Sequence, residues 1–284
     1  MDALELVGEW PVGTVAAGVL APDGSTSTWG PADRPFPLAS VTKPLVALAV
    51  LVAVEEGTLD LDVELTDARL GPGVTVRHLL AHASGLAFDQ VERIALPGHR
   101  RIYSNVGFEI LGDLLATAGG LGVATYLEEG VSQPLGLRAT RLVGSPAAGA
   151  VSTVRDLLVV AAELLAAEPV LLSPGTLRQA RTEQFPGLTG VLPGFGRQRP
   201  NPWGLGFEIR GHKQPHWTGS GNSPTTFGHF GQAGTFLWVD PGWPGALVVL
   251  TDRSFGDWTR DRWPALSDAV LQLGPRPADG GTSP

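Results

Sequence analysis

Two side chains in the segment FPLASVTKPLVALAV, residues 36–50, have the types and the spacing that serine chemistry needs. Ser40 and Lys43 lie three residues apart, so on a helix the hydroxyl and the amine share one face. Pro44 lacks an N–H and fits best in a first turn, so the helix should begin close to Ser40. A helix N-terminus favours a developing negative charge. The pattern therefore predicts a nucleophilic serine whose base is a lysine.

The surroundings of Lys43 matter because a lysine acts as a base only when it is neutral. Its ordinary pKa is about 10.4, so a pKa near 7 needs a shift of ~3 units, or ~4 kcal/mol. Burial lowers the pKa of a lysine, and the apolar run Pro44–Val54 follows directly. Lysine is also rare here, since Lys43 and Lys213 are the only two. An isolated S-x-x-K can still arise by chance.

A second group lies in RIYSNVGFEILGDLL, where Tyr103, Ser104 and Asn105 come just before a predicted helix. A tyrosine near a lysine loses its proton more easily, because the cation favours the phenolate. A phenolate–ammonium pair could take the proton of the serine and return it to a leaving group. Asn105 offers an amide for a substrate carbonyl. Seen alone, the group also fits a loop tyrosine followed by an asparagine cap.

A third group, His229–Phe230–Gly231, opens an apolar strand in TTFGHFGQAGTFLWVD. A glycine in a strand lets the backbone approach a ligand closely. The N–H of Gln232 could then act as an oxyanion donor together with the N–H of Ser40. A glycine-rich hairpin is the alternative explanation.

Other chemistries have weaker signals. The sequence holds no G-x-S-x-G, no Walker A motif and no dinucleotide fingerprint after a strand. His78 and His82 lie one helical turn apart, as do His212 and His216, but the glutamate of H-E-x-x-H is missing. Buried or capping histidines are favoured over a zinc site, so we expect no metal and no cofactor.

Composition limits the partners and the location. The chain has 284 residues, a net charge of -8 and no cysteine. We expect no nucleic acid or membrane partner, because the acidic balance gives no electrostatic attraction to either. The first residues lack the basic start and apolar stretch of a secretory signal. A cytoplasmic protein is the expectation, although a chain trimmed of its leader would look the same.

The order of the elements predicts one folding unit over residues 1–284. Strand patterns with a turn at Asp23–Gly24 come first, followed by a helix over about 44–56. A helical block covers about 57–199, in which Thr153 and Asp156 have capping-box spacing. Strand patterns appear again from about residue 203. The simplest arrangement is an α/β part from about 8–56 and 200–273, with the helical block as an insertion. A cleft is expected between these two parts, and a disordered tail over 274–284.

The motifs SVTK, YSN and HFG, in this order, resemble those of the serine β-lactamase and penicillin-binding-protein superfamily. The branch of class C β-lactamases, D-alanyl-D-alanine carboxypeptidases and related esterases is the most similar. Framework stretches such as GTLDLDVEL, VTVRHLLAHASGL and GAVSTVRDLL extend the resemblance from about residue 10 to 272. It implies an α/β (α+β) β-lactamase-like fold, in which helices flank an antiparallel sheet and a mostly helical subdomain is added.

The resemblance also implies roles for individual residues. Ser40 would be the nucleophile, Lys43 its base or charge partner, and Tyr103 the general acid/base. Asn105 would hold the substrate. The oxyanion donors would be the N–H groups of Ser40 and Gln232.

One departure from the family pattern bears on the substrate. His229 stands where lactamases carry a lysine, and Phe230 stands where members that bind a penicillin or peptide carboxylate have Thr or Ser. A phenyl ring cannot donate a hydrogen bond to a carboxylate. The pattern favours a serine hydrolase acting through an acyl-enzyme, a carboxylesterase on small or medium acyl esters. The alternatives are a β-lactamase or a D-alanyl-D-alanine carboxypeptidase or amidase and, more remotely, a non-catalytic binding or sensor domain. The partner in either catalytic case is a small-molecule ester, amide or lactam.

Overall fold

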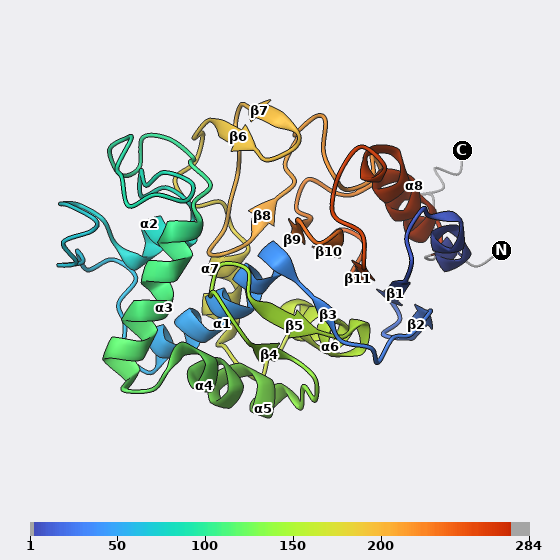
Figure 1. The fold of residues 1–284 in the computed structure, drawn as a ribbon, viewed down its shortest axis with the longest axis horizontal. Coiled ribbons are helices and arrows are strands. Elements are labelled where there is room, and N and C mark those ends of the chain that lie inside the picture. Colours follow the sequence, from blue (N-terminus) through green and yellow to red (C-terminus); the bar gives the residue numbers. More distant parts are fainter. Residues whose placement is uncertain (1–2, 274–284) are drawn as a thin grey trace, which may run out of the picture.

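The computed structural model of the chain describes residues 3–273. Its centre is a six-stranded antiparallel sheet with the order β2-β1-β11-β10-β9-β8. The strands are β1 (Val15–Leu20), β2 (Thr26–Trp29), β8 (Glu208–Ile209), β9 (Phe227–Gly231), β10 (Thr235–Asp240) and β11 (Gly245–Thr251). Strands from the two ends of the chain, β1 and β11, pair side by side (Figure 1). The prediction of a sheet built from both ends of the chain is confirmed for this main sheet.

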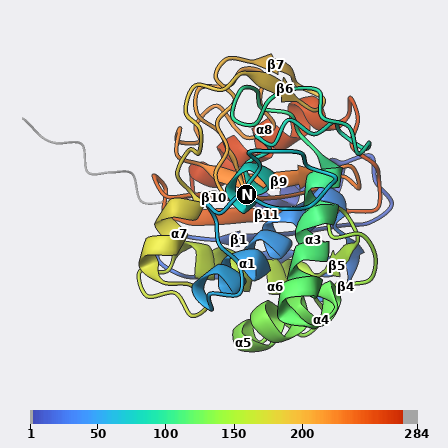
Figure 2. The same ribbon diagram turned by 90° about the vertical axis from the view of Figure 1, so that its left-hand side faces the viewer.

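The two faces of the sheet support two separate cores, because successive residues of a strand point to opposite sides. On one face Trp238 and Val249 pack with the 3₁₀ helix η1 (Ala3–Glu9) and with α8 (Thr259–Leu271). On the other face Leu237 and Val248 belong to the larger core around α1 and α6. Figure 2 shows α8 on one side of the strands, with α1 and α6 on the other. The sheet is therefore covered on both faces.

Helix α1 (Thr42–Glu55) runs through the larger core and carries the predicted serine motif at its start. A 3₁₀ turn, η2 (Ala39–Val41), leads directly into it, so Ser40 lies at the helix N-terminus as predicted. The residues from Thr42 to Leu51 are all buried, because α1 is apolar around its whole circumference. Any polar side chain in its first turn is therefore removed from water.

The helical part follows α1, and Ser104 starts its longest helix by accepting a hydrogen bond from the Gly107 N–H at 3.1 Å. Tyr103 and Ser104 therefore lie just before a helix, as the sequence predicts, and Asn105 is the first residue of that helix. The helices are α2 (Val76–Leu80), α3 (Asn105–Gly119), α4 (Val123–Leu127), a short π-helical segment η3 (Glu128–Ser132), α5 (Gln133–Leu135), α6 (Val154–Leu165) and α7 (Pro174–Ala180).

Short strands that the sequence did not predict lie among these helices. Three of them form a small sheet in the order β3-β5-β4, and two form a hairpin, β6-β7. They are β3 (Phe36–Pro37), β4 (Arg141–Leu142), β5 (Ala150–Ser152), β6 (Gly190–Leu192) and β7 (Gly196–Gln198). Segments of two or three residues are too short to show an alternating pattern.

Helix α6 comes from the middle of the chain but packs against the main sheet. A Cβ added at Gly18 on β1 would lie 2.5 Å from Val154 Cγ1, so the two elements touch closely. Thr153 caps α6 by accepting from the Asp156 N–H at 3.1 Å. The second half of the predicted capping box is wrong, because the Asp156 carboxylate accepts from Ala139 N and Thr140 Oγ1 instead.

Within residues 3–273, no single helix has the length and apolar character needed to cross a membrane. Only α3 together with the segment Val123–Leu135, which meets it at 84°, satisfies those two criteria. The tail predicted to be disordered, 274–284, lies outside the described residues.

Candidate active site

Ser40 and Lys43 meet at the start of α1 as the spacing predicts. Lys43 Nζ lies 3.4 Å from Ser40 Oγ, 2.7 Å from Asn105 Oδ1 and 2.8 Å from the carbonyl oxygen of Ala147. Just before the serine, Ala39 has a φ of 47°, a left-handed conformation that costs a non-glycine residue about 1–3 kcal/mol. The turn that presents Ser40 is therefore held by its surroundings.

The environment of Lys43 favours its neutral form. Burial lowers its pKa to about 7, and the charges of Asp89 and Glu109 offset that effect only in part. A neutral amine has two N–H groups, and the two short contacts, to Asn105 and Ala147, take both of them. The lone pair is then left for the third contact, with Ser40 Oγ. Lys43 is therefore arranged to accept the proton of the serine.

Tyr103 lies between Lys43 and His229. Lys43 Nζ is 4.7 Å from the centre of the Tyr103 ring, and the phenol oxygen is 3.4 Å from His229 Nε2. The expectation of an easily ionised phenol is wrong for the free protein. Burial raises the pKa of Tyr103 above its ordinary value, although contact with Ser40 offsets part of the rise. Tyr103 is thus a neutral phenol, able to donate a proton.

His229 is a neutral ring inside the site. It lies within β9, and its Nδ1 is 2.6 Å from the Phe230 carbonyl oxygen, so this nitrogen carries the ring proton and Nε2 accepts. Burial and the charge of Lys43 lower the pKa of His229 to about 3. The position therefore has no positive charge at neutral pH.

Gly231, at the end of β9, brings the sheet against the serine turn. A Cβ at this position would lie 2.4 Å from the carbonyl oxygen of Leu38 and 3.2 Å from the Ala39 Cβ. The close approach is thus to the backbone before Ser40. Gln232 follows, and like Ser40 it lines the cavity described below.

Phe230 points to the opposite side of β9 from His229, as alternation requires. Its ring belongs to the second core, with its centre 5.1 Å from that of Phe255 and 5.7 Å from that of Phe195. It also lines the cavity, so the wall at this point is apolar.

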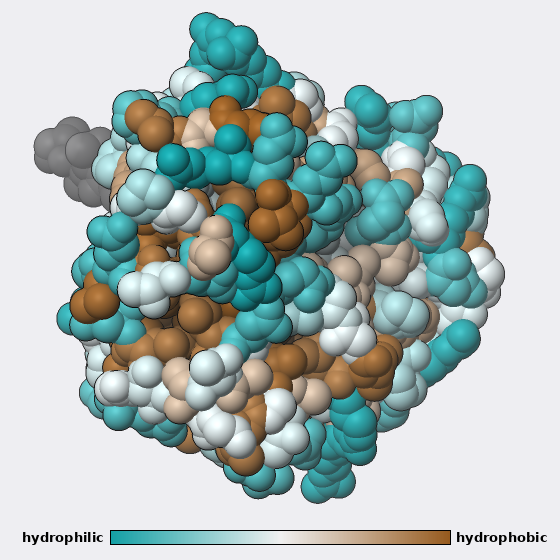
Figure 3. All heavy atoms as spheres, turned by 60° about the vertical axis from the view of Figure 1, so that its left-hand side comes forward, coloured by the Kyte–Doolittle hydropathy of each residue, from teal (hydrophilic) through white to brown (hydrophobic). Residues whose placement is uncertain are grey.

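Most of these groups line a cavity of about 400 Å³, and Lys43 and Gly231 lie just outside its lining. Ser40, Tyr103, Asn105 and His229 reach it, and most of the remaining wall is apolar, formed by residues that include Phe88, Leu192, Pro193, Trp203 and Phe230. From the side of α2 and α3, apolar side chains lie in recesses between hydrophilic ones (Figure 3).

Both the oxygen and the nitrogen of the Asn105 side chain have hydrogen-bond partners within the protein, which the sequence did not predict. Besides accepting from Lys43, it donates through Nδ2 to Asp89 Oδ1 at 2.7 Å. It therefore orients the lysine as well as lining the cavity.

His82 is a residue of the site whose role the sequence did not reveal. The backbone N–H of Ser104 donates to His82 Nδ1 at 3.1 Å, and that of Ile102 donates to the His82 carbonyl at 2.9 Å. The His82 and Tyr103 ring centres are 4.6 Å apart. His82 therefore holds the segment on both sides of Tyr103. The prediction of a buried histidine is right for His82, and His78 is a capping histidine at the start of α2.

A β-lactamase-like fold with a serine and a buried lysine one helical turn apart, facing a tyrosine, defines a class of serine hydrolases. A family model for Beta-lactamase matches residues 7–272. The chain belongs to the Beta-lactamase family.

Individual relatives carry the names of a beta-lactamase, an esterase and a penicillin-binding protein. A solved structure of a beta-lactamase from Mycobacterium bovis is 55% identical, with a TM-score of 0.91, over 96% of this chain and 99% of that one. Esterase EstB of Burkholderia gladioli is 34% identical over 149 residues, 37% of this chain and 38% of the esterase. Penicillin-binding protein 4* of Bacillus subtilis is 28% identical over 136 residues, 38% of this chain and 30% of that protein. The matches to these two proteins thus span well under half of their length.

Proposed function

We propose that the chain is a serine hydrolase that works through an acyl-enzyme and acts on esters with small or medium acyl groups. In the first step Ser40 Oγ bonds to the ester carbonyl carbon while Lys43 takes the hydroxyl proton. The bond to the alcohol then breaks, and Tyr103 supplies the proton that the leaving oxygen needs. The proton held by Lys43 then passes to Tyr103, which restores both groups, and water attacks the acyl-enzyme to release the acid and restore Ser40. The N–H groups of Ser40 and Gln232 would bind the oxyanion.

The observation that carries the choice of an ester is that His229 and Phe230, which both line the cavity with Ser40, offer nothing that would bind a substrate carboxylate. With a pKa of about 3, His229 supplies no charge, and Phe230 supplies no donor for a carboxylate. The cavity of about 400 Å³ suits a short acyl chain. The similarity to a segment of Esterase EstB supports the same choice.

The test is the hydrolysis of p-nitrophenyl butyrate by wild type and by Ser40→Ala. We expect a burst of p-nitrophenol followed by a slower steady state, and a mass increase of one butyryl group on Ser40 in the quenched wild type. The variant should show neither. Full activity of Ser40→Ala would exclude the serine, and a wild type that no ester acylates would favour a non-catalytic binding domain.

A β-lactamase is the second candidate, favoured by the 55% identity to the Mycobacterium bovis structure of that name. Its test is turnover of nitrocefin and covalent labelling by a fluorescent penicillin. Turnover of nitrocefin above the rate for the butyrate ester would replace the first proposal by this one.

A further inference from the structure

A buried ion pair forms part of the cavity wall, away from the serine and its base. Glu208 on β8 has a side chain that is 1% exposed, and that of Lys213 is 0% exposed. Lys213 Nζ donates to Glu208 Oε1 at 2.7 Å and to the Pro202 carbonyl at 3.2 Å. The second lysine of the chain is therefore as deeply buried as Lys43, and it has a carboxylate as its partner.

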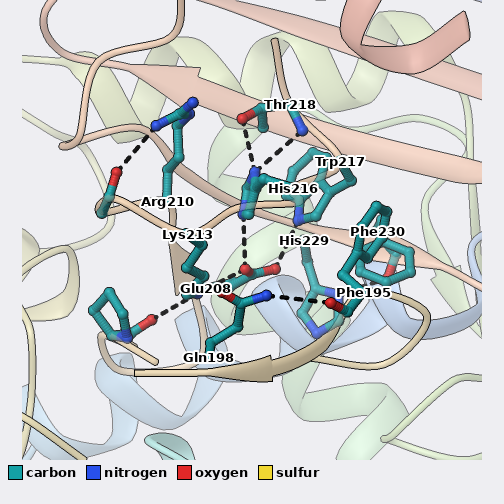
Figure 4. Close-up of polar contacts among 12 residues, drawn as sticks. Phe195, Gln198, Glu208, Arg210, Lys213, His216, Trp217, Thr218, His229 and Phe230 are labelled. Atoms are coloured by element: carbon teal, nitrogen blue, oxygen red, sulfur yellow. Dashed lines mark hydrogen bonds and ion pairs between the residues drawn. The ribbon is translucent and has the colours of Figure 1, made fainter. Parts of the chain in front are cut away.

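Two further donors fix the carboxylate of Glu208 (Figure 4). Trp217 Nε1 donates to Oε2 at 2.7 Å, and His216 Nε2 lies 2.9 Å from Oε1. The Thr218 N–H donates to His216 Nδ1, so the proton of a neutral His216 ring is on Nε2 and points at the carboxylate. Burial alone would raise the pKa of Glu208, but Lys213 and His216 bring it below its ordinary value. The carboxylate is thus ionised and immobile.

The two residues of the ion pair differ in their position relative to the cavity. Glu208 lines the cavity, whereas Lys213 lies behind it and does not. Glu208 is paired in register with Gly228, next to His229. Burial is the largest cause of the pKa shifts of Tyr103 and His229, and the charge of Glu208 raises the pKa of both. Lys213 lowers the pKa of His229, but its effect is smaller than that of Glu208. The negative end of the pair therefore faces the site.

Among the described residues that line the cavity, none carries a positive charge that would offset the negative charge of Glu208. Glu208 is the only carboxylate on the wall, which contains no lysine or arginine. The nearby ammonium of Lys43 is directed at Asn105 and Ala147, and its pKa of about 7 leaves it only partly charged at neutral pH. An anionic group entering the cavity would lose its hydration without gaining a cation, which is costly in a site of low dielectric.

We propose that the Glu208–Lys213 pair is a charge filter, which admits uncharged acyl groups to the cavity and rejects acyl groups that carry a carboxylate. This inference rests on the proposed ester hydrolysis and narrows its substrate class. Glu208 acts as a specificity determinant and takes no part in bond making.

The test compares two p-nitrophenyl esters with the same leaving group, the neutral butyrate and the anionic hemisuccinate. We expect wild-type kcat/KM to favour the butyrate by about tenfold or more. Glu208→Gln removes the negative charge from the wall, so the preference should shrink about tenfold. The charge of Glu208 also raises the pKa of the buried Lys213, so the variant favours a neutral Lys213. Glu208→Gln combined with Lys213→Met removes both charges and should show a similarly reduced preference. The double variant covers the case in which the single variant does not fold.

The matched control is Glu163→Gln, which removes another buried carboxylate, on α6. Glu163 accepts from the N–H groups of Val170 and Leu171, so its loss should lower stability without changing the ester preference. The same preference in wild type and in the Glu208 variants would overturn the filter.

A binding measurement separates failure of the filter from failure of the proposed hydrolysis. Calorimetric titration of wild type with 4-phenylbutanamide and with 4-phenylbutanoate requires no catalysis. We expect tighter binding of the amide. Equal affinity, or tighter binding of the carboxylate, would overturn the inference even if neither ester is hydrolysed.

Discussion

Lys43 shows how three contacts can give an ordinary side chain a special role. A buried ammonium would use three N–H groups, and the site supplies two strong acceptors and one serine hydroxyl. Burial lowers the pKa of Lys43 to about 7, so the neutral amine is abundant under ordinary conditions. The same burial keeps Tyr103 protonated. Above about pH 7 the free site therefore holds mainly a neutral amine beside a neutral phenol.

This protonation state predicts the pH dependence of ester hydrolysis. Lys43 must lose its proton to act, so kcat/KM for a neutral ester should rise with pH and reach half of its plateau near pH 7. The raised pKa of Tyr103 should keep the plateau flat into the alkaline range. Stopped-flow measurement of kcat/KM between pH 5.5 and about 9.5 would check both parts. A profile that falls above pH 7 would show that charged Lys43 is the active form.

The control for this assignment is Lys43→Arg. A guanidinium keeps its proton at every pH used, so the ascending limb should disappear and the rate should fall by about 10²–10⁴. A variant that keeps the limb would place the titrating group elsewhere.

His82 predicts a second effect at the scale of single residues. His82→Phe keeps a ring beside Tyr103 but removes the acceptor of the Ser104 N–H, which should cost about 1–3 kcal/mol of stability. Since the tyrosine would then be held less firmly, kcat should fall by about tenfold or more with little change in KM. Ester kinetics together with thermal unfolding would separate the two effects.

His78→Phe is the matched control. His78 supports the cap of α2 through Thr75 and does not contact Tyr103, so its loss should lower stability and leave kcat near the wild-type value. Equal losses of kcat in the two variants would argue against a positioning role for His82.

At the scale of elements, the site depends on the contact between the end of β9 and the turn η2. Gly231→Ala would put a Cβ 2.4 Å from the Leu38 carbonyl oxygen, so one of the two elements must move. We expect a loss of about 1–3 kcal/mol in stability and a large fall in kcat. Gly122→Ala is the control, because a Cβ at Gly122 meets nothing within 4 Å. Denaturant unfolding and burst kinetics would test the pair, and an active Gly231→Ala would show that the close contact is not needed.

The elements that could be predicted are those long enough to show a period. The apolar helix α1, helices α3 and α6, and strands β1, β10 and β11 all follow from their patterns. The small sheet of β3, β4 and β5 could not be predicted, although it holds the Ala147 region against α1. The N–H of Ala150 donates to Thr42 Oγ1 at 2.9 Å, and the Ala147 carbonyl accepts from Lys43. Such pairings come from tertiary contacts between distant segments.

The residues of the site could be predicted where they belong to a sequence motif. Ser40, Lys43, Tyr103 and His229 were singled out in the sequence, and the fold brings their side chains into one connected set of contacts. Glu208 could not be found in this way, because an isolated glutamate in a strand pattern has no spacing to mark it. Its role depends on which segments fold against it, and those are fixed only in three dimensions.

At the scale of the whole molecule, strands from both ends of the chain form one sheet, and most of the helical part lies to one side of it (Figure 1). The cavity is lined by residues from both parts. Ser40 comes from the turn η2 before α1, Tyr103 from the segment before α3, and His229 from β9 near the other end of the chain. Because these segments are far apart in sequence, the site can form only when the whole unit has folded. Activity and global stability should therefore be lost together on unfolding.

The complete burial of both lysines has a practical consequence for following that unfolding. Lys43 and Lys213 are 0% and 2% exposed, so the folded surface carries its positive charge on arginine. Trinitrobenzenesulfonate, a bulky amine reagent that transfers no acyl group, should leave both side chains unmodified in the native protein and label both in denaturant. Intact mass then counts opened molecules directly, and the labelling rate at low denaturant measures how often the centre of the protein is exposed. Rapid labelling of either lysine in the native state would show that its surroundings open independently of the rest of the protein.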